Sequence, residues 1–182
     1  MKNANPVSLA AKAAVVGVLL AAVCGCGADK APEQAASTKS VFDHFPVMVG
    51  GKQTSLQLAV TDAEQSRGLM QRPDLGGSEG MIFVNTSPRP LTFWMHNTPE
   101  ALDIGYISQD GVIAETYDLL PMDERIVASH RSDLQYALEM PKGWFTANSV
   151  HAGSQIDMAA VAAAMKARGF DPVRYGMKAV SP

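Results

Sequence analysis

Short apolar segments, each bounded by glycine, proline or polar residues, constrain the fold of this chain most strongly. They read FPVMV, SLQLAV, GMIFV, LTFWM, LDIGYIS, VIAETYDL and YALEM. Segments of this length and composition are typical of β-strands, and Gly50-Gly51 and Gln109-Asp110-Gly111 suit tight turns between them. The proline-containing sequence SPRP is expected to end the GMIFV strand. We therefore predict a compact, mainly β domain, an antiparallel sandwich or barrel.

Two helices are expected in addition to the strands. Thr61 precedes a helical segment and Glu64 follows three residues later, which is the spacing of a capping box. Gly68 and Pro73 should end this short early helix. The alanine-rich residues 156–170 carry apolar side chains at helical spacing, so they predict a C-terminal helix.

The N-terminus has the layout of an export signal. Lys2 and Lys12 precede a short apolar run over residues 13–23, which falls well below the roughly 20 residues that a membrane-spanning helix needs. The following Val23-Cys24-Gly25-Cys26 resembles the lipobox of bacterial lipoproteins, which implies that residues 1–25 are removed and that Cys26 carries lipid. The alternative is a plain secreted protein.

This resemblance also implies a location for the chain. Residues 26–40 have no aromatic residue and no apolar periodicity, so they predict a flexible tether between a lipid on Cys26 and the domain. The chain would then be anchored in the cell envelope and face the periplasm. By resemblance to a lipoprotein sorting rule, the absence of aspartate directly after Gly27 favours the outer membrane.

The charge of the mature chain argues against nucleic acid as a partner. Removal of residues 1–25 takes away two of the 15 lysines and arginines and none of the 18 acids, which leaves 13 − 18 = −5. Nucleic-acid binders normally present a basic surface instead. The expected partners are the membrane, through the lipid on Cys26, and an unidentified small ligand or envelope protein.

Three blocks of sequence carry a family resemblance. They are RGLMQRPDL at 67–75, EGMIFV at 79–84 and FWMHNTPEALDIGYI at 93–107, followed by QDGVIAE and YALEMPKG. In this order they resemble the family known as domain of unknown function 192. The resemblance implies a mainly β sandwich or barrel, often exported, and implies no activity. We accordingly divide the chain into a domain at 41–155 and a helical extension at 156–182.

The chain departs from the pattern of that family at two positions. His96 stands where members usually carry lysine, and Ser154 follows Gly153 where an aspartate is usual. The first departure weakens any role that needs a permanent positive charge at that position.

The most informative polar residue is Asp103, an acid within the apolar LDIGYIS segment. A buried carboxylate needs a partner, and Arg67 and Arg72 are the expected ones. One interpretation is a structural ion pair that holds the early helix against the sheet. The other is a polar pocket in which Arg67, Arg72, Asp103, His96 and Asn97 bind a small ligand.

The remaining residues of the FWMHNT block have two interpretations each. Trp94 is expected in the core, because aromatic residues dominate burial in small domains. Alternatively, it stacks on a ligand at a concave surface. Asn97 and Thr98 precede Pro99 and are expected to cap the end of a strand, while Asn97 is also a candidate binding residue.

Catalysis has little support in the sequence. The chain has no nucleophile elbow, phosphate-binding loop or dinucleotide fingerprint, and its four histidines are scattered, so we assign no catalytic residue, cofactor or metal. The leading hypothesis is an envelope lipoprotein that binds a small ligand or a partner. The alternatives are a hydrolase-like enzyme that uses Asp103 or Glu139, and a purely structural module. Glu139 also lies in an apolar segment, where it could equally pair with an arginine.

Overall fold

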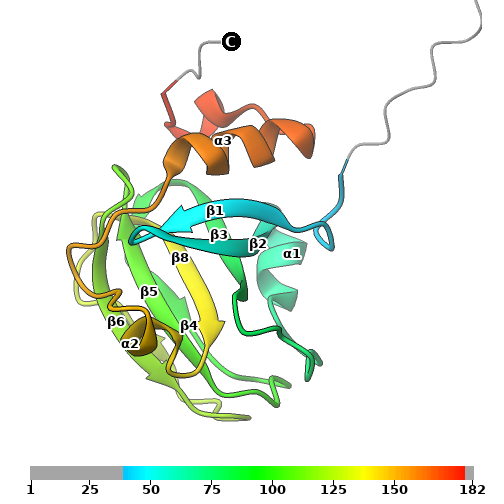
Figure 1. Ribbon diagram of the computed structural model, residues 1–182, viewed down its shortest axis with the longest axis vertical. Helices are drawn as coiled ribbons and strands as arrows, with labels where there is room; N and C mark the ends of the chain where they lie inside the picture. Colours follow the sequence, from blue (N-terminus) through cyan, green and yellow to red (C-terminus); the bar gives the residue numbers. More distant parts are fainter. Residues whose placement is uncertain (1–38, 179–182) are drawn as a thin grey trace, which may run out of the picture. The chain divides into compact units, whose positions relative to one another are not determined.

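The structure, a computed structural model, describes residues 39–178, and its main feature is a six-stranded β-sheet (Figure 1). Its strands, in spatial order, are β1 (Phe45–Val49), β2 (Lys52–Ala59), β3 (Glu79–Arg89), β8 (Leu134–Pro141), β5 (Leu102–Ser108) and β6 (Ile113–Leu119). A separate two-stranded sheet pairs β4 (Thr92–Phe93) with β7 (Val127–Ala128). The predicted mainly β fold is confirmed, and the large sheet stays open, with β1 and β6 at its edges.

One pair of neighbouring strands is parallel, so the sheet is mixed. β2 runs parallel to β3, whereas the other four neighbouring pairs are antiparallel. Parallel neighbours need a crossover connection, and here the crossover contains helix α1 (Asp62–Arg67). The remaining helical segments are α2 (Trp144–Ala147), α3 (Met158–Ala167) and the 3₁₀ helix η1 (Pro172–Tyr175).

Local sequence signals explain where α1 begins and ends. The Thr61 hydroxyl accepts the backbone N–H of Glu64, and the Glu64 carboxylate accepts the N–H of Thr61 at 3.0 Å, which is the predicted capping box. Gly68 ends the helix at φ +46°, a conformation that residues with a Cβ rarely adopt. Both predictions for this helix are therefore confirmed.

Strand β3 is longer than expected. The SPRP sequence was predicted to end it, but the strand continues through Pro88 to Arg89. Its pairing with β8 shifts register between Val84 and Arg89. A proline is tolerated at such an irregularity because no ladder hydrogen bond is required from its nitrogen.

The alternation of side chains along the strands gives the sheet two different apolar faces. In β8, Leu138 and Met140 join a core with α2 and α3, and we call this side the α3 face. Ala137 points the opposite way, into a second core that contains Leu69, directly after α1. We call this side the α1 face. Figure 1 shows α3 alongside β1, and α1 and α2 at different sides of the sheet.

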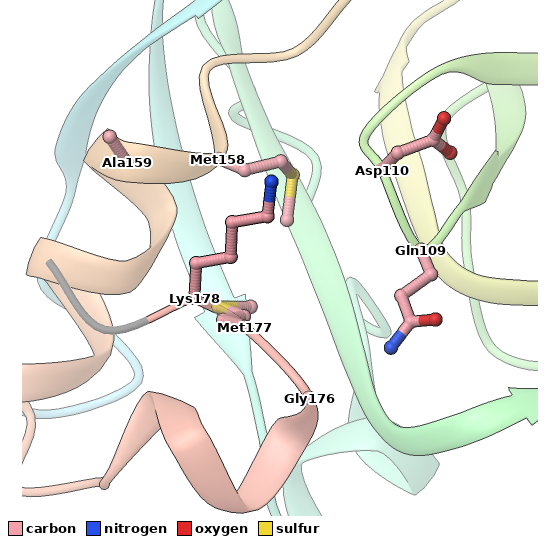
Figure 2. A pocket seen from close by; sticks show the side chains of 7 residues that line it. All are labelled: Gln109, Asp110, Met158, Ala159, Gly176, Met177 and Lys178. Atoms are coloured by element: carbon pink, nitrogen blue, oxygen red, sulfur yellow. The ribbon is translucent and has the colours of Figure 1, made fainter.

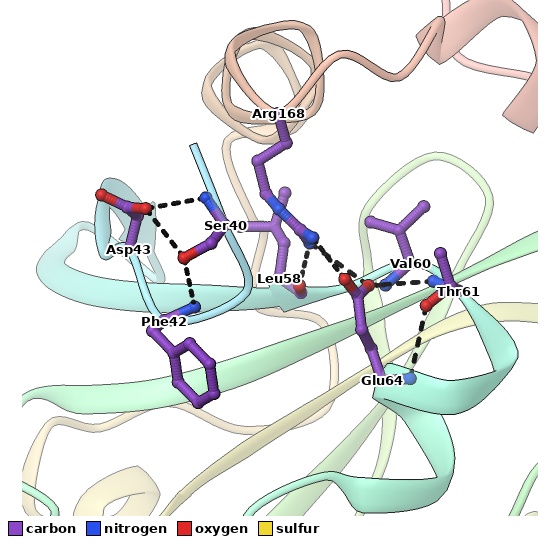
Figure 3. Close-up of polar contacts among 8 residues, drawn as sticks. All are labelled: Ser40, Phe42, Asp43, Leu58, Val60, Thr61, Glu64 and Arg168. Carbon is purple, nitrogen blue, oxygen red and sulfur yellow. Dashed lines mark hydrogen bonds and ion pairs between the residues drawn. The ribbon is translucent and has the colours of Figure 1, made fainter. Parts of the chain in front are cut away.

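A buried arginine joins the C-terminal helix to α1. Arg168, 8% exposed, donates from its guanidinium to the carbonyl of Leu58 and to the Glu64 carboxylate (Figure 3). The same carboxylate accepts backbone N–H groups from Val60 and Thr61. Although burial opposes it, these bonds lower the pKa of Glu64. The predicted C-terminal helix is therefore an integral part of the packed core.

Candidate functional site

Asp103 lies on the α3 face, where its carboxylate is fully engaged. Its Oδ2 accepts the backbone N–H of Gly143 at 2.9 Å and that of Phe145 at 3.3 Å. Its Oδ1 lies 3.2 Å from Nζ of Lys142, which also contacts Asp118 at the surface. These contacts hold β5 against the start of α2, so the role of Asp103 is structural.

The predicted pairing of Asp103 with Arg67 or Arg72 is wrong, because these arginines lie near the opposite face. Arg72 donates to the side chain of Gln57 at 3.1 Å and to Asp74 at 2.9 Å. Gln57 is buried on β2 between side chains that point to the α3 face, so it points to the α1 face. The five-residue pocket predicted around Asp103 therefore does not form as one site.

Glu139 is a buried acid of the α1 face, and none of the described residues is a partner for its carboxyl group. It lies on β8, is 4% exposed, and pairs in register with Met81 of β3 and Ile104 of β5. Within residues 39–178, no hydrogen-bond donor or cation contacts its carboxyl group. Burial raises the pKa of Glu139 to about 8, so the group keeps its proton at neutral pH.

The Glu139 carboxyl borders a small cavity, which we call the Glu139 pocket. Its volume is about 40 Å³. The loop at the end of α1 forms one wall, and β3, β4 and the turn that contains Thr98 supply the rest. The lining residues are Gln65, Ser66, Arg67, Gly68, Leu69, Met70, Phe83, Phe93, Trp94, Thr98 and Glu139.

Aromatic rings dominate the apolar part of this pocket. Phe83 and Phe93 pack edge to face with ring centroids 4.8 Å apart, and Phe93 continues to Tyr106 at 5.9 Å. Trp94 is 48% exposed, so the prediction that it belongs to the core is wrong. Strand β4 ends at Phe93, which releases Trp94 from the sheet and leaves it at the edge of the pocket.

His96 and Asn97 lie beside Trp94, outside the pocket lining. The His96 ring stacks on the Trp94 ring at 4.8 Å and 19°. His96 Nδ1 lies 2.6 Å from the Glu124 carboxylate, and the Asn97 amide donates to His96 Nε2 at 2.9 Å. Both ring nitrogens of His96 are thus engaged. Asn97 adopts φ +52°, consistent with a turn.

Arg67 connects the Glu139 pocket with a neighbouring hollow of about 320 Å³. Arg72 and Gln57 also line that hollow. The Arg67 guanidinium lies 5.4 Å from the ring of Phe42, in a cation–π contact. Arg67 and Arg72, both predicted binding residues, therefore share this hollow. The Arg67 guanidinium contacts Phe42, and that of Arg72 contacts Gln57 and Asp74.

An open groove of about 450 Å³ adjoins the Glu139 pocket on its other side. The two cavities share Gln65, Ser66, Phe83, Phe93 and Trp94. The groove adds polar groups from the end of β3, including Arg89, whose guanidinium donates to Asn85 at 2.6 Å. A ligand group in the pocket could therefore continue into the groove.

A larger hollow, of about 700 Å³, lies between the β5–β6 turn, the start of α3 and residues 176–178. Figure 2 shows Lys178 extending toward Met158, with Gln109 and Asp110 on the opposite side. The Asp110 carboxylate accepts the Ser108 hydroxyl at 2.6 Å. None of the described residues that line this hollow is a buried polar group comparable to Glu139, so the Glu139 pocket is the stronger candidate.

Two further observations concern the described residues. No cluster of three histidine, cysteine, aspartate or glutamate side chains suited to a metal occurs among residues 39–178. Within the same range, no helix has the length and apolar character needed to cross a bilayer. Cys26, the predicted lipidation site, lies outside the described residues.

Sequence reasoning found Glu139 but did not place it in a pocket. The available signal was an acid inside an apolar strand, and the predicted partner was an arginine or a catalytic role. Phe83, Leu69 and Gln65 were not predicted, because nothing in their local sequence distinguishes a pocket wall from a core. Their convergence depends on the crossover that carries α1 over this face.

The comparisons with known proteins agree with the fold. One crystal structure, of a protein of unknown function from Novosphingobium aromaticivorans DSM 12444, is 34% identical, has a TM-score of 0.59, and covers 63% of this chain and 84% of its own. Another, from Sinorhizobium meliloti 1021, is described as a candidate transcription regulator; it is 27% identical, has a TM-score of 0.61, and covers 65% of this chain and 96% of its own.

Among curated proteins, none is significantly similar to this chain. The family DUF192, described as "Uncharacterized ACR", matches residues 46–158, which include β1 except its first residue, β2 to β8, α1, α2 and the whole Glu139 pocket. The match ends at the first residue of α3, so all but the first three residues of the helical extension lie beyond it. This chain belongs to the DUF192 family.

Proposed function

We propose that this chain is an envelope lipoprotein whose domain binds a small ligand in the Glu139 pocket. One observation carries the binding role: the carboxyl group of Glu139, a residue only 4% exposed, borders a cavity and receives no hydrogen bond from the described residues. Buried polar groups are almost always hydrogen-bonded, and one that lacks a partner within the protein indicates a bound water, an ion or a ligand. The open groove beside the pocket provides a route of entry.

The location rests on the N-terminal sequence. A lipid on Cys26 would hold the mature chain at the membrane, facing the periplasm, with the outer membrane favoured by the residues directly after Cys26. The net charge of −5 supports a ligand or protein partner and not nucleic acid. For this reason we do not transfer the regulator description of the Sinorhizobium protein to this chain.

Replacement of the lipobox cysteine tests the anchor. Cells that express Cys26→Ala should incorporate no labelled palmitate into the protein and should accumulate uncleaved precursor. Cys24→Ala is the matched control, because it removes the neighbouring thiol and leaves Gly25-Cys26 intact. Persistent label on Cys26→Ala would refute the lipoprotein assignment.

A thermal-shift screen of the full chain against small envelope metabolites tests the binding role. A compound that binds the folded state raises the melting temperature in proportion to the logarithm of its excess over Kd. The shift should disappear in Glu139→Gln and persist in Glu124→Gln, a matched variant of an exposed acid near the same site. Compounds that shift both variants equally would argue against the pocket.

The hydrolase alternative retains one supporting observation. Glu139, with its pKa near 8, holds a proton at neutral pH as a general acid would. Asp103 no longer supports an enzyme, because its carboxylate is fully occupied. Thr98, a buried hydroxyl-bearing residue of the pocket, donates its hydroxyl to the His96 carbonyl. Binding without chemistry is therefore the better supported function, and a screen without hits would favour the structural module.

A further inference from the structure

We infer that the Glu139 pocket receives a primary ammonium group, so that the ligand is a small amine or carries an amine at one end. This inference rests on the proposed binding function. It concerns which chemical group can occupy the pocket, and the size, lining and charge of the pocket each bear on it.

The carboxyl group of Glu139 needs hydrogen-bond donors. An ionised carboxylate accepts up to about four hydrogen bonds, and even the protonated form keeps unused acceptor capacity. No side chain or backbone N–H of residues 39–178 supplies a donor. An ammonium group carries three donors on one atom and would satisfy several of these sites at once.

The volume of the pocket limits the size of the group. A cavity of about 40 Å³ holds only a few non-hydrogen atoms, since one water needs about 10–15 Å³ in the same measure. A terminal CH₂–NH₃⁺ is within this limit. The rest of the ligand would extend into the adjoining groove, which shares five residues with the pocket.

The lining favours a cation over an anion. Phe83, Phe93 and Trp94 contribute aromatic rings, and cations are attracted to the faces of such rings. Arg67 also lines the pocket, but its guanidinium lies 5.4 Å from the ring of Phe42, in a cation–π contact. A buried ion pair between carboxylate and ammonium is strengthened by the low local dielectric.

The charged and titratable groups near Glu139 are few. Arg67 lies on the α1 side, and Tyr106 lies on β5 and donates its hydroxyl to the Val127 carbonyl at 2.6 Å. β3 and β4 contribute only uncharged side chains to the lining. The titration of Glu139 therefore dominates the pH dependence of any ligand that contacts it.

This titration gives amines and acceptor ligands opposite pH dependences. An ammonium ion binds the ionised carboxylate, so binding releases a proton and strengthens as pH rises. With the Glu139 pKa at about 8, the ionised fraction rises from roughly 0.1 at pH 7 to roughly 0.9 at pH 9. The apparent Kd for an amine should therefore fall about tenfold over this range. A carboxylate or amide acceptor needs the protonated acid and should bind more weakly at pH 9.

The experiment is a titration of the full chain in detergent with methylammonium, acetate and acetamide at pH 7 and pH 9. Binding is followed through the side-chain carbonyl NMR signal of ¹³C-labelled Glu139, assigned by its loss in Glu139→Gln. We expect methylammonium to shift this signal with about tenfold tighter binding at pH 9. Sodium chloride at equal ionic strength controls for salt, and Glu124→Gln should behave as the wild type.

The outcomes separate the two proposals. If acetate or acetamide shifts the Glu139 signal and methylammonium does not, the ammonium inference fails and the pocket remains a binding site. Methylammonium binding that is equal at the two pH values also overturns the inference. If no probe shifts the signal, the pocket holds water only, and both the inference and the proposed binding role fail.

Discussion

Asp103 and Glu139 are buried acids on neighbouring strands, one residue apart in register. They differ in whether the protein supplies hydrogen-bond donors to the carboxyl group. Asp103 pairs with Met140, the residue directly after Glu139, so the two carboxyl groups point to different faces of the sheet. Asp103 receives two backbone N–H groups and Lys142, whereas Glu139 receives no donor from the described residues. The face that an acid occupies in an apolar strand therefore decides whether its carboxyl group is bound by the protein or is left without a donor.

The difference arises from the segments that cover each face of the sheet. β8 leads directly into α2, and the turn at Gly143, with φ +83°, directs N–H groups at Asp103. The α1 face is covered by the end of a crossover helix and by aromatic side chains, which offer no donor to Glu139. One acid thus stabilises the fold, while the other lowers stability unless a ligand is present.

Removal of the occupied acid should cause the largest loss of stability. Asp103→Ala should lower the free energy of unfolding by about 3–4 kcal/mol, because it leaves two N–H groups and a cation without their partner. Denaturant unfolding measures this change. Asp118→Ala is the matched control, since it removes the exposed acid that contacts the same lysine, and it should cost less than about 1 kcal/mol. Equal losses would mean that burial does not distinguish the two acids.

Glu139→Gln should raise the stability of the protein at high pH, whereas Asp103→Ala lowers it. Because the folded pKa of about 8 lies above the unfolded value, near 4.3, this group destabilises the wild type progressively as pH rises from about 4 to 8. The variant should exceed the wild type in the free energy of unfolding by on the order of 4–5 kcal/mol at pH 8 and by only a few tenths of a kcal/mol at pH 4. Denaturant unfolding across this range measures the difference. A difference that is independent of pH would show that Glu139 is not desolvated.

Removal of Lys142 alone should show how much of the stabilisation at Asp103 comes from the lysine and how much from the two backbone N–H groups. Lys142→Met should cost about 1 kcal/mol, because the lysine is partly exposed and the two backbone N–H groups remain bound to the carboxylate. A double-mutant cycle with Asp118→Ala measures the contact of Lys142 with Asp118, so the cost of Lys142→Met in the Asp118→Ala background reports the contact with Asp103. A loss as large as that of Asp103→Ala would assign the stabilisation to the lysine and not to the start of α2.

A change beside the Glu139 pocket should have the smallest effect. His96→Lys places at this position the residue usual in the family. It should change the free energy of unfolding by less than about 0.5 kcal/mol and therefore alter the melting temperature little. His96 is partly exposed and Glu124 is exposed, so the hydrogen bond between them contributes little. A loss comparable to that of Lys142→Met would mean that this rim helps to hold the α1 face together.

Local features of the fold could be predicted because they depend on few neighbouring residues. The capping box at Thr61 and Glu64, the glycine turn at Gly50-Gly51 and the late alanine-rich helix are all confirmed. The SPRP segment was misjudged because a register shift with β8 accommodates Pro88, and that partner strand is about 50 residues away in sequence.

The sequence by itself determined most of the strands, the early and the late helix, and the presence of two acids within apolar strands. It could not determine their partners, because alternation fixes only which side chains share a face and not which connection covers that face. The tertiary structure decided this through the crossover of α1 and the direct passage from β8 into α2. These connections gave Asp103 a complete set of donors and left Glu139 facing a cavity.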